Sequence, residues 1–497
     1  MLTALLAAGV WVLGVLTTGE AEEGPVRDIR TAERQLFVDD WIVAEMANMQ
    51  REQGVPRKHP GNPVIKRDKP WDMGRADLYG SAVYDPDSGK IQLFYAANNV
   101  FRGHEDRLAY AESHDGGATW TKPELGLIPF GDHRLTNIVL LPPSQTMHGP
   151  CVFRDTHETD PAKRYKLFTA SYPDTAYLGI PRIYEHRGAF LYGLKDAQLP
   201  PDCRAPGMYV AWSPDGIHWP EPPVHISDMM SDTTQCAFWD ERIGKYVAYV
   251  RARTANDRSV ARIDSEDFLT WTEPRVVLEG TVAQCIYSMG VTPYQGLYIG
   301  TPWIFDRGSE ARGGPVIWPE LAVSRDGVTW MRPFPGRPLI ANGPPESADC
   351  RQIRMSASLV VLEDRILLAY GQTDRPHVTD MRVEIGVATL RLDGFVAMKA
   401  GDAEGTILTR QLRFTPGRLY VNAAVEPGGY IKAEVLRGDD GVEGYALPNC
   451  NAVTGDSLRA AVTWQRYEAV PDSGQGDCRI RFLLKKARLY SFWIEPQ

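Results

Sequence analysis

Carboxylates that recur at a fixed spacing are the first residues in this sequence that could carry out chemistry. Four segments follow or nearly follow the pattern Ser-x-Asp-Gly-x-x-Trp, and their aspartates are Asp115, Asp215, Asp267 and Asp326. Such an aspartate accepts hydrogen bonds from backbone N–H groups one or two residues on, and the glycine supplies a positive φ. The tryptophan packs the turn against its surroundings. We therefore expect structural turns here rather than catalytic groups.

Each turn ends a repeated unit of strands. An apolar strand, a short turn and an aromatic strand recur at 80–95, 151–168, 236–249, 290–299 and 358–370. The fifth unit lacks the full pattern and ends at Asp393 and Gly394. Five units predict five blades of about four strands each. A strand at 35–43 is expected to complete the last blade and close the ring, which removes exposed sheet edges.

The pattern changes after residue 396. Alternating segments at 406–409, 418–423, 430–436, 460–464 and 478–483 are typical of sandwich strands, and 487–493 reads as a final buried strand. The sequence therefore predicts an all-β chain, with a five-bladed β-propeller over residues 34–395 and a C-terminal β-sandwich over residues 396–497.

The N-terminal segment is a separate feature. Residues 2–16 are nearly all apolar, and 19–21 form a small-x-small cleavage pattern. The apolar run is short for a membrane span, which needs roughly 20 residues. We interpret residues 1–21 as a signal peptide, which predicts a secreted or periplasmic protein. The charged residues that usually precede such a run are missing, so an uncleaved anchor is the alternative.

Net charge limits the partners. The chain of 497 residues carries a formal charge of −9, which favours neither nucleic acid nor an anionic membrane surface. We expect no membrane partner beyond export, and the sequence does not indicate an oligomeric state. Seven cysteines are an odd number for an exported chain. Cys151, Cys236 and Cys285 lie in apolar segments and are expected in the core, whereas Cys450 and Cys478 could pair.

The repeated turns resemble the Asp-box of sialidases and similar turns in furanosidase propellers. A five-bladed propeller followed by a β-sandwich resembles glycoside hydrolase family 32, and families 43, 68 and 117 share the propeller. The resemblance implies a glycosidase with a carbohydrate substrate, an oligo- or polysaccharide. It also implies a pair of carboxylates on the inner strands of the first three blades, on the face opposite the box turns. We expect no organic cofactor, and the resemblance leaves open a structural cation on the propeller axis.

The family pattern can be carried over one blade at a time. Asp77 falls where the nucleophile or base would lie, and Asp72 is its local competitor. In the second blade Gly149 occupies the expected aspartate position, so His148 is the residue that could bind hydroxyls, orient a carboxylate or give a proton. The third blade lacks the expected glutamate, and Asp232 is the nearest carboxylate.

Loops at the funnel mouth supply further candidates. If the proton donor lies elsewhere, Glu346, just before the fifth inner strand, is the expected residue. Aromatic side chains there can stack on sugar rings, and arginines can fork onto carboxylates or sulfates. The expected substrate-binding residues are Trp71, His148, Arg251, Arg354, Trp303 and Asp374. A long insertion at 173–207 could cover the same face as a lid, or form a surface excursion.

Two rival functions remain open at this point. A sialidase-like exo-glycosidase would have six blades and an arginine triad, whereas five repeats are visible here. A non-catalytic carbohydrate-binding propeller is the second rival, because the second and third blades depart from the family pattern. Two carboxylates facing each other across the funnel would favour hydrolysis. A funnel of arginines and aromatic rings alone would favour binding.

Overall fold

The computed structural model describes residues 25–98, 106–144, 146–172, 182–184, 190–192, 206–229, 231–308, 314–377, 382–474 and 478–496. Within this part the chain is almost entirely β-structure, as predicted, with two 3-10 turns at Pro161–Lys163 and Leu447–Asn449. The expected signal peptide and most of the insertion at 173–207 lie outside the described residues. No helix in the described part has the length and apolar character needed to cross a bilayer.

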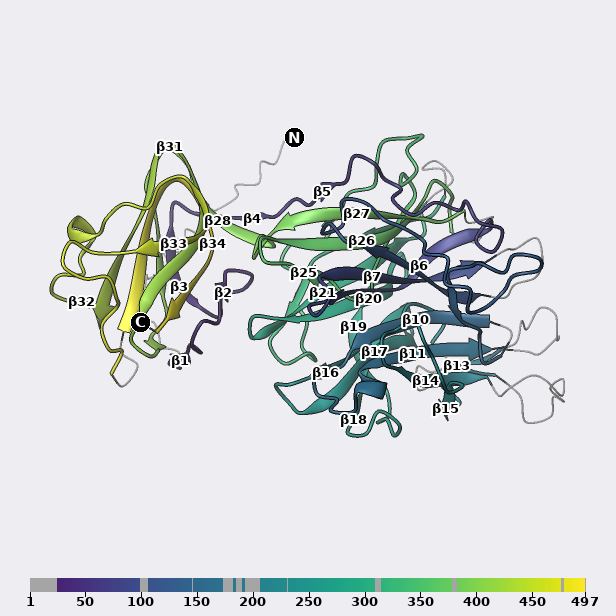
Figure 1. Cartoon of the computed structure of the whole chain (residues 1–497). Coiled ribbons are helices and arrows are strands. Elements are labelled where there is room, and N and C mark those ends of the chain that lie inside the picture. The colour runs from purple at the N-terminus through teal and green to yellow at the C-terminus, as the bar shows by residue number, and fades with distance from the viewer. Residues whose placement is uncertain are drawn as a thin grey trace, which may run out of the picture.

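The first three blades are separate four-stranded antiparallel sheets (Figure 1). The first blade consists of β6 (Arg75–Asp85), β7 (Lys90–Asn98), β8 (Arg107–Ser113) and β9 (Ile138–Leu140). The second consists of β10 (Thr146–Arg154), β11 (Tyr165–Tyr172), β14 (Gly207–Ser213) and β15 (Val224–Ser227). The third consists of β16 (Cys236–Asp240), β17 (Lys245–Thr254), β18 (Asp257–Ser265) and β19 (Arg275–Glu279). Each sheet pairs its strands in chain order, as a propeller blade requires.

The fourth and fifth blades share one nine-stranded sheet. The fourth consists of β20 (Gln284–Tyr294), β21 (Leu297–Asp306), β22 (Val316–Pro319) and β23 (Ala322–Ser324). The fifth consists of β24 (Gln352–Met355), β25 (Val360–Val361), β26 (Arg365–Thr373) and β27 (Glu384–Arg391). A single parallel pair, Ile317 with Gln352, joins β22 to β24 and so connects the two blades.

The strand that closes the ring differs from the one expected. β5 (Arg57–Lys58) pairs with β27 and adds the outer strand of the fifth blade. The segment 35–43 was expected there, but β2 (Gln35–Leu36) pairs with β34 and β3 (Val43–Ala47) pairs with β29, both in the C-terminal sheet. The start of the propeller therefore moves from residue 34 to the link between β4 (Gln50–Gln53) and β5. The expectation was wrong because the alternation in 35–43 fits an edge of either sheet equally well.

Small side chains connect the inner strands of neighbouring blades. Each accepts a hydrogen bond from a backbone N–H of the next inner strand: Ser81 from Val152 at 2.8 Å, Cys151 from Ala237 at 3.3 Å, Cys236 from Val291 at 3.2 Å, and Ser356 from Ala82 at 3.0 Å. This series gives Cys151 and Cys236 a structural role. Both thiols are buried, as is that of Cys285, which confirms their predicted place in the core.

The four repeated turns have the expected local geometry. In the fourth blade Asp326 accepts hydrogen bonds from the backbone of Val328 at 2.8 Å and Thr329 at 2.7 Å, and Trp330 Nε1 donates to the carbonyl of Gly327. Burial alone would raise the pKa of Asp326, but these N–H donors outweigh it and hold the pKa at about 2. The turns follow the third strand of each blade, so they lie at the opposite end from the start of the inner strand.

Each turn also fastens its blade to the preceding one. A side chain at Gly327 would meet Arg262 and Tyr249 of the third blade within 3 Å. In the third blade Phe268 replaces the glycine with a φ of 67°, and its ring packs 5.7 Å from that of Phe153 in the second blade. The aspartates therefore shape turns that hold neighbouring blades together.

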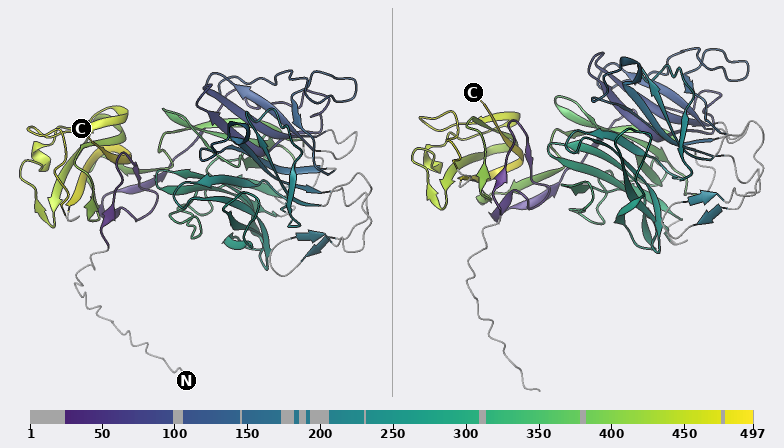
Figure 2. Two further views of the ribbon diagram at one scale, coloured as in Figure 1. Left: turned by 60° about the horizontal axis from the view of Figure 1, so that its bottom comes forward. Right: turned by 90° about the horizontal axis from the view of Figure 1, so that it is seen from below.

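The C-terminal region folds around a core of its own. Its strands form one 11-stranded sheet that includes β28 (Val396–Ala400), β29 (Gly405–Thr409), β31 (Arg418–Arg437), β33 (Asp456–Val462) and β34 (Cys478–Glu495). The purple N-terminal strands lie beside this yellow and green region in both views of Figure 2. Cys450 and Cys478, which could have paired, are both buried and are not joined by a disulfide to each other.

The degenerate fifth turn connects the two regions. Asp393, with a φ of 60° and no exposed surface, accepts hydrogen bonds from Arg34 at 2.8 Å and Ser491 at 2.6 Å. Asn422 and the hydroxyl of Tyr294 complete its partners. The fifth aspartate thus binds side chains of the C-terminal region and of the fourth blade, whereas the aspartates of the four box turns bind groups of their own turns.

Candidate active site

Polar and aromatic side chains from all five blades meet near the start of the inner strands. We call this group the axis cluster, and its members are Asp77, Tyr79, His148, Asp232, Arg251, Tyr287, Trp303, Arg354 and His377. Most lie on or next to the first strand of a blade: β6, β10, β20 and β24, and the loop before β16. Arg251, Trp303 and His377 come from or after the second strand.

A local irregularity in three inner strands positions these side chains. The register of the inner pair shifts between Asp77 and Ser81 in β6, between His148 and Cys151 in β10, and between Ile286 and Met289 in β20. Bulges of this kind turn a side chain away from the regular alternation and are frequent beside active sites. In β10 the bulge uses Gly149, whose φ is 64° and whose added Cβ would lie 1.9 Å from the Thr233 carbonyl oxygen. The glycine that replaces the expected aspartate is therefore required by close packing.

Asp77 and Arg354 form a buried ion pair. Arg354 Nη1 lies 3.1 Å from Asp77 Oδ2, and both side chains are essentially unexposed. Neither carboxylate oxygen of Asp77 has a hydrogen-bond partner within the described residues. Burial alone would lower the pKa of Arg354, but Asp77 and Tyr79 outweigh it and raise the pKa. A buried pair with so few hydrogen bonds is costly, and such arrangements are concentrated at functional sites.

Asp232 is the more accessible carboxylate of the cluster. Its side chain is 30% exposed, and its oxygens lie 3.2 Å from His148 Nε2 and 3.7 Å from Arg251 Nη1. Burial lowers the pKa of His148, and Asp232 opposes that shift only in part. The imidazole is therefore neutral at pH 7, and its Nε2 faces an Asp232 oxygen.

Aromatic rings join the two carboxylate sites. The hydroxyl of Tyr79 lies 3.1 Å from that of Tyr287, and the Tyr79 ring meets the ring of His148 edge-on at 5.1 Å. Trp303 stacks on Tyr287 at 6.0 Å and lies 5.7 Å from Tyr79. Asp77 and Asp232 thus belong to one connected cluster, since Arg354 contacts the face of Tyr79 at 4.9 Å.

His377 covers the tyrosine pair. Its Nε2 lies 3.0 Å from the Tyr287 hydroxyl. Burial, followed by the charges of Arg258, Arg354 and Arg251, lowers the pKa of His377 to about 3. A neutral imidazole here can accept a hydrogen bond from the Tyr287 hydroxyl without adding positive charge.

The sequence also predicted six substrate-binding residues. The contacts of five of them show where they lie. His148, Arg251, Arg354 and Trp303 join the axis cluster. Trp71 instead lies in the core of the first blade, where its Nε1 donates to Asn137 at 2.7 Å. The competitor Asp72 is also structural, since it is buried and pairs with Lys122 at 2.5 Å.

The remaining two candidates lie outside the cluster. Glu346 is exposed on a turn with a φ of 75°, and no hydrogen bond or ion pair joins it to the described cluster residues. Asp374 is half exposed and lies 3.5 Å from Arg375 Nε. Both side chains therefore lie at the surface. Glu346 precedes β24 and Asp374 follows β26, as the sequence predicted.

Several cluster members had not been expected from the sequence. Tyr79 lies two residues after Asp77, and Tyr287 opens the fourth inner strand as His148 opens the second. The bulge follows His148 in β10 and Ile286 in β20, so aligning the blade openings by the bulge would have found Tyr287 within one position. His377 follows the second strand of the fifth blade without any sequence signal of its own.

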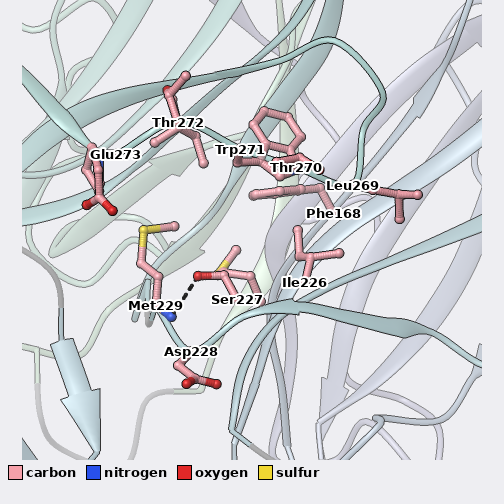
Figure 3. Close-up of a pocket in the computed structure, with 13 residues that line it drawn as sticks. Phe168, Ile226, Ser227, Asp228, Met229, Leu269, Thr270, Trp271, Thr272 and Glu273 are labelled. Carbon is pink, nitrogen blue, oxygen red and sulfur yellow. Dashed lines mark hydrogen bonds between the residues drawn. The ribbon is translucent and has the colours of Figure 1, made fainter.

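A separate pocket of about 630 Å³ lies at the outer rim of the propeller (Figure 3). It is formed between Ile226 to Met229, at the outer strand of the second blade, and the box turn around Trp271 in the third. No member of the axis cluster lines it. The described residues hold no group of three histidine, cysteine or acidic side chains placed to bind a metal ion.

Comparison with known proteins gives distant structural similarity. No family model and no curated protein sequence matches the chain. Among solved structures, it is similar to the catalytic domain of a Coprinopsis cinerea GH62 α-L-arabinofuranosidase, with 12% identity, a TM-score of 0.44, and coverage of 68% of this chain and 97% of the other. A putative glycoside hydrolase from Bacteroides ovatus shows 16% identity and a TM-score of 0.44, covering 67% of this chain and 96% of its own.

Proposed function

We propose that this protein is a glycoside hydrolase that cleaves an oligo- or polysaccharide at the axis cluster. One observation carries the proposal: Asp77 and Asp232, from different blades, lie in a single cluster with aromatic rings between them. Glycoside hydrolysis needs two carboxyl groups, one to protonate the leaving oxygen and one to attack or to activate water. Tyr79 and Trp303 add aromatic rings to the cluster beside the carboxylates.

The two aspartates have environments suited to different roles. Arg354 lies beside Asp77 and stabilises its charged form, which suits a nucleophile or a general base. Asp232 reaches solvent beside the neutral His148, so its carboxylic acid form can give its proton to the leaving oxygen and become the carboxylate. We therefore assign Asp77 to attack or base catalysis and Asp232, with His148, to proton donation.

The proposed place of action is outside the cytoplasm. The apolar segment at 2–16 and the small residues after it support cleavage and export. N-terminal sequencing of the mature protein, after expression of the full chain in a bacterial host, would test this. We expect a first residue near position 22, and an intact N-terminus retained with the membrane fraction would contradict export by a cleaved signal.

A substrate screen with two variants tests the activity. Purified protein is assayed on aryl-furanosides, aryl-pyranosides and plant or marine polysaccharides. We expect Asp77→Asn and Asp232→Asn each to lower kcat by about 10²- to 10⁴-fold. Asp374→Asn, a matched change at the exposed rim, is expected to leave kcat unchanged.

Each result of the screen has a defined reading. Full activity in both variants would contradict the assignment of the site. Saturable sugar binding without any hydrolysis would favour the non-catalytic carbohydrate-binding propeller. Hydrolysis of sialosides with release of free sialic acid would favour the sialidase-like alternative.

A further inference from the structure

Arg354 is buried in the axis cluster with an unused hydrogen-bonding surface. Its side chain has no exposed area, yet Nε, Nη1 and Nη2 have no hydrogen-bond partner among the described residues. Its contacts there are the ion pair with Asp77 and the face of Tyr79. Buried donors are almost always paired in folded proteins, so a guanidinium left in this state indicates a functional contact.

Arg251 has a similar environment beside the second carboxylate, that of Asp232. Its side chain is also unexposed, and Nη2 donates to the Tyr287 carbonyl at 2.6 Å. Nε and Nη1 are buried without a hydrogen-bond partner in the described part of the chain, and the Asp232 oxygen is 3.7 Å away. Both buried arginines therefore keep fork-like donor groups unused.

A third arginine faces the same tyrosine. The guanidinium carbon of Arg251 lies 4.4 Å from the Tyr287 ring centre, and that of Arg258 lies 5.2 Å from it. Arg258 shares the carboxylate of Asp257 with Arg253 and Arg307. Three guanidiniums therefore gather around one carboxylate beside the cluster, although the whole chain carries −9.

We infer that the sugar bound at the axis carries an anionic group, a carboxylate or a sulfate ester, held by Arg251 and Arg354 with Arg258 beside them. This inference rests on the proposed function and names its substrate class. Carboxylate and sulfate oxygens accept charge-assisted hydrogen bonds from guanidinium forks, and these bonds are stronger than those to neutral hydroxyls.

Matched pairs of ligands test the inference. The carboxylate arm compares 4-nitrophenyl glucuronides and galacturonides with the corresponding glucosides and galactosides, and polygalacturonate with its carboxyl-reduced form. The sulfate arm compares a sulfated galactan with its desulfated form. We expect one arm to show at least about a tenfold preference in kcat/KM for the anionic member, which weakens as ionic strength rises.

Binding is measured independently of hydrolysis by titration calorimetry with oligosaccharides of the same polymers. Arg251→Gln is expected to weaken binding of the anionic ligand by about 10- to 100-fold and to lower the ratio of anionic-ligand to neutral-ligand affinity. Arg251→Lys keeps the charge but loses the fork and is expected to fall between the two. Arg459→Gln, on the exposed surface of the C-terminal region, is the matched control and should bind as the wild type does.

The outcomes separate the two proposals. Equal hydrolysis and binding of neutral and anionic members would overturn the inference and leave the glycosidase proposal standing. Anionic ligands that bind through Arg251 without being cleaved would support the inference and contradict the glycosidase proposal. If Arg251→Gln fails to fold by thermal unfolding, Arg258→Gln provides the same comparison at a partly exposed position. If both variants keep the preference for the anionic ligand, the inference is overturned.

Discussion

The box turns and the axis cluster use aspartate in opposite ways. Asp326 sits at a box turn with its oxygens occupied by Val328, Thr329 and Ser324. Asp77 is fully buried at the axis, has Arg354 at 3.1 Å, and neither of its oxygens has a hydrogen-bond partner in the described part of the chain. Satisfied polar groups indicate structure, and buried groups held with unused capacity indicate a place for a ligand.

The repeat therefore locates the chemistry indirectly. Four similar aspartates attract attention in the sequence, yet each serves its own turn and the contact with the preceding blade. The aspartates proposed for catalysis do not repeat, because each blade contributes a different side chain to one asymmetric site. A pseudo-symmetric scaffold can carry such a site since its inner strands all begin at the same end.

The largest expected effect distinguishes the two kinds of aspartate by activity. Asp77→Asn should lower kcat by about 10²- to 10⁴-fold because it removes the attacking or basic group. Asp326→Asn should change kcat by less than about twofold, since its turn lies at the opposite end of the blade. For both variants kcat is measured per folded molecule, and the folded fraction is taken from circular dichroism. Similar losses in both variants would contradict the distinction.

The junction aspartate should matter most for stability. Asp393→Ala leaves Arg34 unpaired and removes the acceptor of Tyr294, Asn422 and Ser491. We expect the free energy of unfolding to fall by about 3 kcal/mol in urea titrations, while kcat per folded molecule is kept. An unchanged unfolding midpoint would show that this junction contributes little.

A regular box turn should contribute less. Asp326→Ala removes the acceptor for two backbone N–H groups in a half-exposed turn, and we expect a loss of about 1–2 kcal/mol in the same titration. Asp364→Ala is the control, because Asp364 is exposed and pairs only with its neighbour Arg365 among the described residues. Its effect should stay within about 0.5 kcal/mol. Equal losses would contradict a structural role for the box.

The smallest effect is a pH dependence. Side-chain and backbone hydrogen bonds from Thr119 hold the pKa of Asp115 at about 2, and backbone N–H groups hold that of Asp326 at the same level. Because both folded pKa values lie below the ordinary value, the stabilisation is present above about pH 4 and is lost as pH falls toward 2. A double Asp115→Asn, Asp326→Asn variant should show a flatter stability profile between pH 4 and 2. An identical slope would contradict the turn hydrogen bonds.

The features that the sequence predicted correctly are those that depend on a local pattern of residues. The box turns and the strand pairs of each blade are short-range features, so composition and spacing were sufficient. The ring-closing strand was missed because β5 is two residues long and carries no alternation of its own. The same limit applies to the site: His377 and Tyr287 meet through a contact across 90 residues, and no local signal marks it.

The carried-over residues show the same division. Asp77 and His148 lie beside inner-strand bulges, and strand order alone places such positions at the axis. Trp71 precedes the first strand in the sequence, but its indole turns into the core of the blade to meet Asn137. Side-chain direction in a loop depends on tertiary packing, which spacing does not encode.

The central claim is that Asp77 and Asp232 face one bound sugar. The most direct measurement is a crystal structure of Asp232→Asn soaked with a substrate found in the screen. The account predicts a sugar ring at the axis cluster, with its scissile bond between residues 77 and 232. A sugar bound instead in the rim pocket beside Trp271, with the axis cluster unchanged, would contradict it.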